Sequence, residues 1–197
     1  MHNLLAAILL LGATPFWETR PPAEWSNAEL RQMVTDSPWG QMVGPMRSFP
    51  GSAPVAVFFA TAKPVRLAEA EAHRRYRKEG EEESPSDAEF REFLEKEGAN
   101  NIVIAVQVHD RSVLEDAGEM RRMERESLLR VGRRKYKVKV QFAPGPNDPF
   151  VRLVFPRAVG PEDRRIDISL YVPGEGAPYR EASFSLKDMV YQGKLEL

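Results

Sequence analysis

The stretch Trp25–Trp39, WSNAELRQMVTDSPW, carries the sharpest local signals in the chain. Ser26 and Glu29 have the spacing of a capping box, in which each side chain bonds the backbone N–H of the other residue at a helix start. Trp25 precedes this cap and Leu30 is the fourth helical position, which favours a hydrophobic contact across the start. The pattern predicts a short amphipathic helix, and we expect the two indoles to fill a core.

The same stretch also predicts where this helix stops. Pro38 disfavours helical backbone at Ser37, so the helix is expected to end near Asp36. Asp36 or Ser37 can then cap a second short helix with Pro38 in its first turn. An Asp–Ser pair between two tryptophans could instead form a ligand site, but we expect a buried helix–turn–helix.

Two motifs near opposite ends of the chain carry a resemblance. They are WSxxEL…DSPW, which begins at Trp25, and MVYxGxLEL, which runs from Met189 to Leu197. The residues Ala62, Pro64, Val65 and Arg66 match as well. On these residues the chain resembles an uncharacterised family of exported bacterial proteins. The resemblance implies export and a shared fold, and it implies no activity.

The first residues have the pattern of an export signal. An apolar run from Leu4 to Leu11 has the length of a signal-peptide core and is too short to span a bilayer. Ala13 is a small residue where cleavage could occur, although His2 is the only basic side chain before the run. We therefore expect residues 1–13 to be a signal peptide and residues 14–197 to be one domain without a transmembrane segment. The mature protein would then be periplasmic or secreted.

Composition narrows the classes of function. A chain of 197 residues with 42% hydrophobic and 29% charged residues is typical of one globular domain with a sizeable core. The formal net charge is −1, so no field of the whole protein attracts nucleic acid, and we expect no nucleic-acid partner. There is no cysteine, which excludes disulfides and thiol catalysis. No ligand spacing indicates a metal, and we expect no cofactor.

Hydrophobic patterning predicts a mixed fold. The expected elements of the first half are a strand at 55–60, a helix at 67–78, an acidic loop at 80–85, a helix from Ser86 to Gly98 opened by a Ser86–Glu89 capping box, a strand at 102–108, and a helix from Ser112 to about Glu126. Both strands are almost unbroken apolar runs, which is typical of strands buried on both faces. The helical segment between them could place them parallel.

The second half of the chain changes to strand periodicity. Strands are expected at 135–142, 150–155, 166–172, 182–186 and, as an edge strand, at 190–197. The predicted fold class is α+β, a single domain in which N-terminal helices and two buried strands are followed by an antiparallel β-meander that completes the sheet.

Few residues offer catalytic chemistry. After the leader only His73 and His109 remain, and His73 lies among charged residues of a surface helix. His109 and Asp110 follow a buried strand, a place where sites often lie, and they are candidate ligand-binding residues. Neighbouring residues on a strand point to opposite faces, so Asp110 can orient His109 only if the chain turns there. The sequence supports no catalytic assignment.

The one asymmetric feature is a basic segment between residues 121 and 139. Lys135, Lys137 and Lys139 alternate with Tyr136, Val138, Val140 and Phe142. This alternation predicts that the lysines share a solvent face and that the apolar residues face inward. The lysines are therefore further candidate ligand-binding residues, for a phosphate-bearing polymer or lipid headgroups. They could equally serve only to block edge pairing.

Two functions from different classes fit these observations. The leading interpretation is an exported, non-enzymatic binding, structural or accessory protein of the cell envelope, whose partner is an anionic surface or envelope component. The alternative is a small hydrolase-type enzyme with a site near His109 and Asp110. The first rests on the lack of catalytic spacings, and the second would need polar partners around His109.

Overall fold

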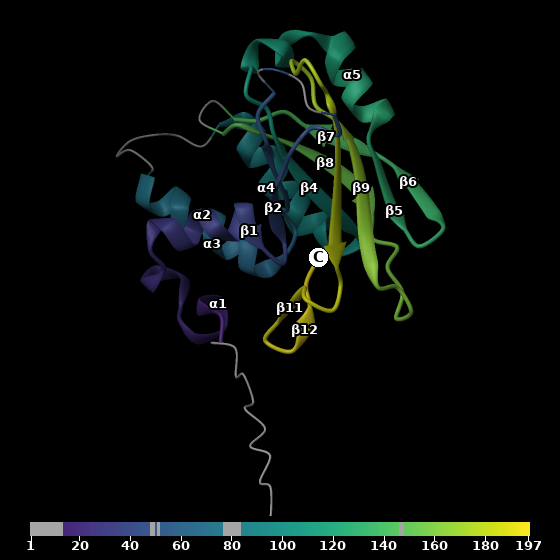
Figure 1. Ribbon diagram of the computed structural model, residues 1–197. Coiled ribbons are helices and arrows are strands. Elements are labelled where there is room, and N and C mark those ends of the chain that lie inside the picture. Colours follow the sequence, from purple (N-terminus) through teal and green to yellow (C-terminus); the bar gives the residue numbers. More distant parts are fainter. Residues whose placement is uncertain (1–13, 48–49, 51, 77–83, 146–147) are drawn as a thin grey trace, which may run out of the picture.

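The structure is a computed structural model that describes residues 14–47, 50, 52–76, 84–145 and 148–197 (Figure 1). The expected leader, residues 1–13, lies outside the described residues, and so do residues 80–83 of the expected acidic loop. The described chain forms an α+β fold in which every strand pair is antiparallel. The predicted fold class is thus confirmed.

The larger sheet has six strands in the order β1-β2-β3-β4-β8-β7. The strands are β1 (Asp36–Ser37), β2 (Gly40–Val43), β3 (Val55–Phe59), β4 (Asn101–Gln107), β8 (Phe150–Pro156) and β7 (Val140–Phe142). Every residue of β3 is buried, as the apolar run predicts. Helices α2 (Asn27–Thr35), α3 (Lys63–Tyr76) and α4 (Pro85–Glu97) pack on one face of this sheet.

The two buried strands pair antiparallel, which corrects the expected parallel arrangement. Phe59 of β3 lies opposite Ile104 of β4. After β3 the chain leaves the sheet and forms the helices α3 and α4. It then re-enters the sheet as β4 at the same end at which β3 left it. Contacts at this end show the return, because Ala60 N lies 2.8 Å from Val103 O and Val103 N lies 3.2 Å from Thr61 Oγ1.

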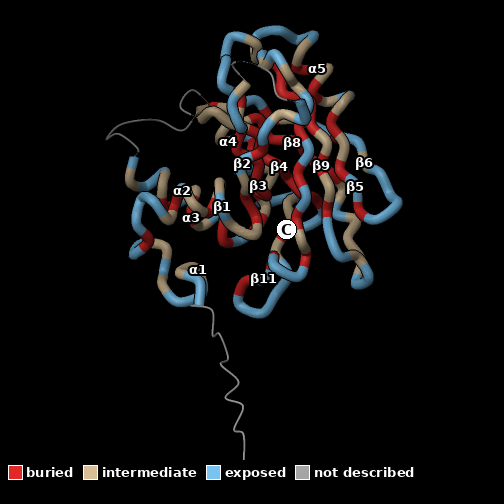
Figure 2. Tube along the Cα trace, viewed as in Figure 1, coloured by how far each residue is buried: buried red, intermediate tan, exposed pale blue. Residues whose placement is uncertain are grey.

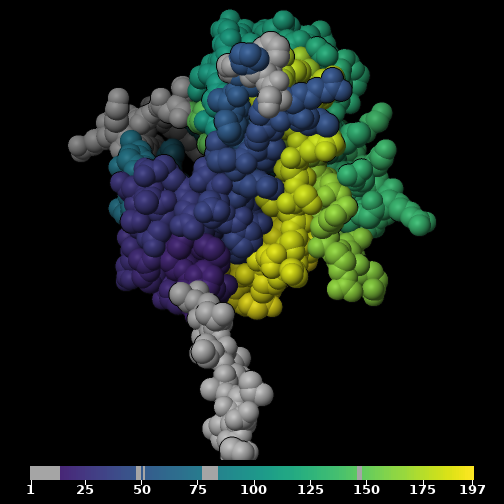
Figure 3. All heavy atoms as spheres, in the orientation of Figure 1, coloured from purple at the N-terminus to yellow at the C-terminus, as the bar shows by residue number. Residues whose placement is uncertain are grey.

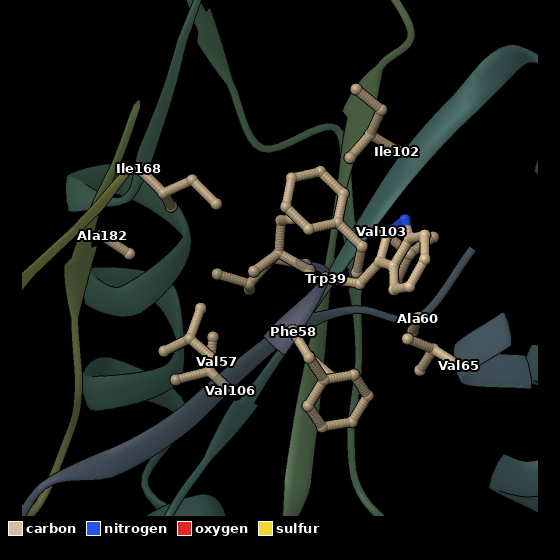
Figure 4. Packing of buried hydrophobic residues seen from close by; sticks show 14 of the residues in the cluster. Trp39, Val57, Phe58, Ala60, Val65, Ile102, Val103, Val106, Ile168 and Ala182 are labelled. Carbon is tan, nitrogen blue, oxygen red and sulfur yellow. The ribbon is translucent and has the colours of Figure 1, made fainter. Parts of the chain in front are cut away.

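The second sheet has four strands in the order β10-β9-β5-β6. They are β10 (Tyr179–Ser185), β9 (Arg165–Tyr171), β5 (Leu128–Val131) and β6 (Arg134–Lys137). Its inner face packs on the larger sheet, where the rings of Phe59 and Phe184 meet at 4.8 Å. Figure 4 shows the interior between the sheets, with Val57 and Val106 of one sheet near Ile168 and Ala182 of the other.

The two sheets also meet along both edges. On one side Pro45, just after β2, bridges to Arg180 of β10, and Met46 N bonds Tyr179 O at 3.1 Å. On the other side β6 leads within two residues into β7 of the larger sheet. The strands therefore enclose one core, which Figure 2 shows as the buried centre of the molecule.

The capping box at Ser26 is present as predicted. Glu29 N lies 3.2 Å from Ser26 Oγ, and Ser26 N lies 2.8 Å from Glu29 Oε2. Trp25 and Trp39 are both buried, also as expected. Their indole N–H groups are satisfied, since Trp25 Nε1 donates to Arg20 O and Trp39 Nε1 to Glu196 O, each at 3.0 Å.

The second helix expected after Asp36 does not form, and a tight β1–β2 hairpin takes its place. Ser37 closes the preceding helix, because its hydroxyl donates to Met33 O at 2.6 Å and accepts from Trp39 N at 3.1 Å. Gly40 lets the hairpin lie against the helix, since a Cβ there would stand 2.6 Å from the Val34 carbonyl. The signal for this turn was the glycine after Trp39.

Several helix boundaries also differ from those expected. Helix α3 begins at Lys63 because Pro64 fits the first turn of a helix. Helix α4 is capped by Ser84 in place of Ser86, with Pro85 at its first position.

The helix expected from Ser112 is split in two. It forms the 3₁₀ turn η3 (Arg111–Glu115), capped by Asp110, and helix α5 (Ala117–Glu126), capped by Asp116. Asp110 and Asp116 replace Ser112 as the capping residues, because each carboxylate accepts a hydrogen bond from the backbone N–H two residues later.

The C-terminal strand is also divided. Residues 190–197 contain the small hairpin β11 (Val190–Tyr191) and β12 (Lys194–Leu195), in which Gln192 and Gly193 adopt positive φ. This hairpin and the short helix α1 (Phe16–Thr19) lie at one end of the molecule, and α5 lies at the other (Figure 1). Within the described residues, no helix combines the length and the hydrophobicity needed to cross a bilayer.

Candidate functional site

Four loops meet at the end of the molecule beside α5, and we call this region the loop end (Figure 1). It consists of the described parts of residues 44–54, 108–116, 143–149 and 172–178. Ala177 N bonds Ser52 Oγ at 3.3 Å, and Arg111 bonds Gly145 O at 2.8 Å and Asp148 O at 2.9 Å. These contacts join loops that lie far apart in the sequence, so the loop end is built by the fold.

His109 lies in this region with a specific partner. Its Nδ1 lies 3.0 Å from Oε1 of Glu175, which comes from the loop between β9 and β10. The His109 side chain is 37% exposed, and that of Glu175 is 9% exposed. An ionised carboxylate only accepts hydrogen bonds, so the pair requires the proton on Nδ1. In the neutral ring Nε2 is then an acceptor, and no described residue bonds it.

Behind Glu175 lies a fully buried arginine. Arg180 is 0% exposed, and its Nη2 lies 3.3 Å from Glu175 Oε2. Its guanidinium also donates to the backbone carbonyls of Ala53, Ala177 and Tyr179. Burial lowers the pKa of Arg180 and Glu175 opposes that shift. One carboxylate therefore links an internal cation to a surface imidazole, and we call these three residues the His109–Glu175–Arg180 array.

Asp110 does not orient His109. Its carboxylate accepts from Ser112 N at 2.9 Å and from Ser112 Oγ at 2.6 Å, which starts the turn η3. These hydrogen bonds lower the pKa of Asp110. The chain does turn after His109, but it brings the imidazole to Glu175 instead. Gly174 allows this approach, because at its φ of +77° a Cβ would stand 2.9 Å from Val113.

The sequence indicated one member of the array and missed the other two. Arg180 lies in phase with Ala182 and Phe184 on β10, all three of which are buried. A charged residue on the apolar phase of a strand was therefore an available signal. Glu175 gave a weaker one, since it stands between two glycines in a turn.

The three lysines do not form one surface. All three are exposed, as expected, but only Lys135 and Lys137 lie on β6, whereas Lys139 follows this strand and its Nζ bonds Asn101 Oδ1 at 3.0 Å. The predicted alternation also fails at Val140, which is 40% exposed. The reason is that the chain passes from the second sheet to the larger sheet at Val138 and Lys139. No hydrogen bond or ion pair joins Lys135 or Lys137 to the array.

A second charged cluster lies between β8 and the helices. Arg152 bonds Asp148, lies 3.4 Å from Glu69 Oε1 and stacks 4.6 Å from the ring centre of Phe90. Burial raises the pKa of Glu69 to about 7, although the charge of Arg152 acts against this shift. The contacts place this cluster between secondary-structure layers, so its first role is to join α3 and α4 to the sheet.

Metal chemistry has no preformed site in the described chain, where no group of three or more His, Asp or Glu residues could hold an ion. Comparison with known proteins gives no matching family model and no significant match to a curated protein or a solved structure.

Proposed function

We propose that this chain is an exported, non-enzymatic protein of the cell envelope that binds a polar envelope component at the loop end, with His109 contacting the ligand. The hydrogen bond between His109 and Glu175, backed by Arg180, carries the proposal. The apolar run at Leu4–Leu11 and the resemblance of the Trp25 and Met189 motifs support export.

The array supports binding because it fixes the exposed imidazole of His109 by means of two charged side chains, Glu175 and Arg180, that are largely buried. A buried arginine is stabilising only where its partners are well placed. Here Arg180 holds Glu175, and Glu175 holds the imidazole in one tautomer and one orientation. A fixed hydrogen-bonding group at the end of a strand scaffold loses little entropy when a ligand arrives. Such a group is typical of a ligand site on loops.

The chemistry of Nε2 indicates the class of ligand. With Nδ1 donating to Glu175, the neutral ring accepts a hydrogen bond through Nε2. Hydroxyl and amide N–H groups supply that bond, and the sugar polymers of cell envelopes carry both. We therefore propose a hydroxyl- and amide-bearing sugar chain as the ligand.

Histidine-selective NMR tests the proposal directly. Protein with ¹⁵N-labelled histidine is titrated with soluble oligosaccharides of N-acetylglucosamine. The ring signals of His109 should move and saturate, while those of His73, exposed on α3, should not move. His109→Gln should weaken binding by about three- to tenfold, the range of one neutral hydrogen bond, and the matched change His73→Gln should have no effect. Binding that leaves His109 unmoved, or no binding, would contradict the proposal.

One observation favours a second candidate, a small hydrolase-type enzyme. A histidine whose Nδ1 is held by a carboxylate is the arrangement that a general base requires. The described residues offer no nucleophile bonded to Nε2, and the Ser112 hydroxyl is donated to Asp110. The general base would therefore act on water. Shortened oligosaccharides in the same titration, absent with His109→Gln, would favour this enzyme over the binding protein.

A further inference from the structure

The outer face of the second sheet carries cations on three neighbouring strands. They are Arg130 of β5, Lys135 and Lys137 of β6, and Arg165 of β9, and we call them the cationic face. All four are exposed. Among the described elements, α5 covers only the end of this outer face, where Arg122 lies 4.3 Å from the ring centre of Tyr171. Figure 3 shows side chains of the β5–β6 segment projecting from the right-hand edge of the molecule.

Strand register brings these cations together. Arg130 lies opposite Lys135 on β6 and opposite Asp167 on β9. Residues paired across strands project from the same face, at about 5 Å across strands and about 7 Å between alternate residues along one. Lys137 and Arg165 extend the group along their own strands. The cationic face is therefore one patch of basic side chains that spans three neighbouring strands.

The charge on this face is only partly balanced. Asp167 is the acid at its centre, and its Oδ2 lies 3.4 Å from Arg130 Nε and 3.3 Å from Arg165 Nε. Ser183 Oγ donates to the other oxygen of Asp167 at 2.8 Å. Lys135 and Lys137 form no ion pair with any described residue. Asp167 thus holds the arginines in place, and the lysines remain available to an anion.

Edge protection does not explain the whole arrangement. Lysines on an edge strand do prevent unwanted pairing, and β6 is the edge of this sheet. Arg130 and Arg165, however, lie on β5 and β9, which are interior strands. Both of these strands are paired on each side, so Arg130 and Arg165 cannot serve to prevent pairing at a sheet edge. Their gathering beside the lysines points to an anionic ligand.

The surroundings of the cationic face select the kind of anion. Of the described large hydrophobic residues that are exposed, only Tyr179 belongs to this sheet, and its hydroxyl bonds Glu126 of α5 at 2.8 Å. Apart from Tyr179 and the half-buried Leu128, the outer face is polar, so it offers few apolar side chains to insert into a bilayer and few aromatic platforms on which bases stack. Arginine and lysine together suit phosphate groups. We propose that the cationic face binds a linear phosphate-bearing polymer of the cell envelope, independently of the His109 site.

The test compares two neutralising variants of equal charge. Lys135→Gln/Lys137→Gln removes two charges from the cationic face, and Lys187→Gln/Lys194→Gln removes two exposed charges from elsewhere on the chain. Binding to long-chain inorganic polyphosphate is measured across a salt series. Single-stranded DNA and vesicles of phosphatidylglycerol are measured at the same phosphate concentration, and thermal unfolding checks that each variant folds.

The wild type should bind polyphosphate, and its affinity should fall as salt rises. The Lys135/Lys137 variant should bind at least about tenfold more weakly, with a salt slope reduced by about 1.4, or about 0.7 per lost contact. The Lys187/Lys194 variant and His109→Gln should bind as the wild type does. Absence of wild-type binding, equal loss in both lysine variants, or preference for DNA or vesicles would overturn the inference.

Discussion

The two ends of the molecule are stabilised by different chemistry. At one end Trp25 and Trp39 are buried, their indole N–H groups are satisfied, and the ring of Trp17 lies 5.9 Å from that of Trp39. We call this the aromatic end. At the loop end, Arg180 bonds three backbone carbonyls and the carboxylate of Glu175, and Nε2 of His109 has no bond to a described residue. The aromatic end is closed by packing, whereas the loop end presents a fixed polar group to solvent.

Truncating Trp39 should have the largest effect and should act on stability alone. Trp39→Ala removes a fully buried indole and its bond to Glu196 O, so the free energy of unfolding should fall by about 3–5 kcal/mol. Denaturant unfolding measures this loss. Met42→Ala, at an exposed position of β2, is the control and should change stability by at most about 0.5 kcal/mol. A folded Trp39→Ala protein with an altered His109 environment would break the distinction between the two ends.

Removing the buried arginine should affect both stability and the site. Arg180→Met leaves the nearly buried carboxylate of Glu175 without its cation and should cost about 3 kcal/mol. Glu175→Gln added to Arg180→Met should recover part of this loss, because the uncompensated charge is then gone. A double-mutant cycle measures the coupling free energy. Losses that simply add would show that the two residues do not act as a pair.

Two glutamates on α3 should give opposite pH dependence. Burial raises the pKa of Glu69 from 4.5 to about 7, so the native state keeps a proton that the unfolded chain has lost between these pH values. The free energy of unfolding should therefore fall as pH rises through this range, by about 1–3 kcal/mol. Glu69→Gln should remove this dependence, as urea unfolding at several pH values would show.

Glu71 provides the matched comparison. Hydrogen bonds from Arg74 and Arg75 lower its pKa to about 2. Its stabilisation is therefore complete above pH 4.5, the ordinary pKa of the group, and is lost as pH falls towards 2. Glu71→Gln should leave the slope between pH 4.5 and 7 unchanged. The same slope change in both variants would contradict the raised pKa of Glu69.

The smallest effect is expected on the outer face of the second sheet. Lys135→Glu and Lys137→Glu alter exposed side chains that pair with no described acid, so each should shift the free energy of unfolding by at most about 0.5 kcal/mol. Thermal unfolding of the two single variants measures this. A loss of several kcal/mol would mean that these lysines stabilise the fold.

Local signals predicted most of the secondary structure and little of the site. The Ser26 capping box and the buried strands β3 and β4 could be predicted from the sequence, because each depends on residues that are close together along the chain. The pairing of His109 with Glu175 joins residues 66 positions apart and depends on how the loops meet. Likewise, the alternation of inward and outward side chains stops at Lys139 because the chain passes there from one sheet to the other, and the sequence pattern alone does not reveal this change.

The central claim is that Glu175 fixes His109 as a ligand-facing group, and ¹⁵N NMR of the histidine rings tests it most directly. The wild-type spectrum should show His109 as one tautomer with its proton on Nδ1, whereas the exposed His73 should show both tautomers. Glu175→Ala should return His109 to the pattern of His73. A wild-type His109 that already matches His73, or one unchanged by Glu175→Ala, would contradict the account.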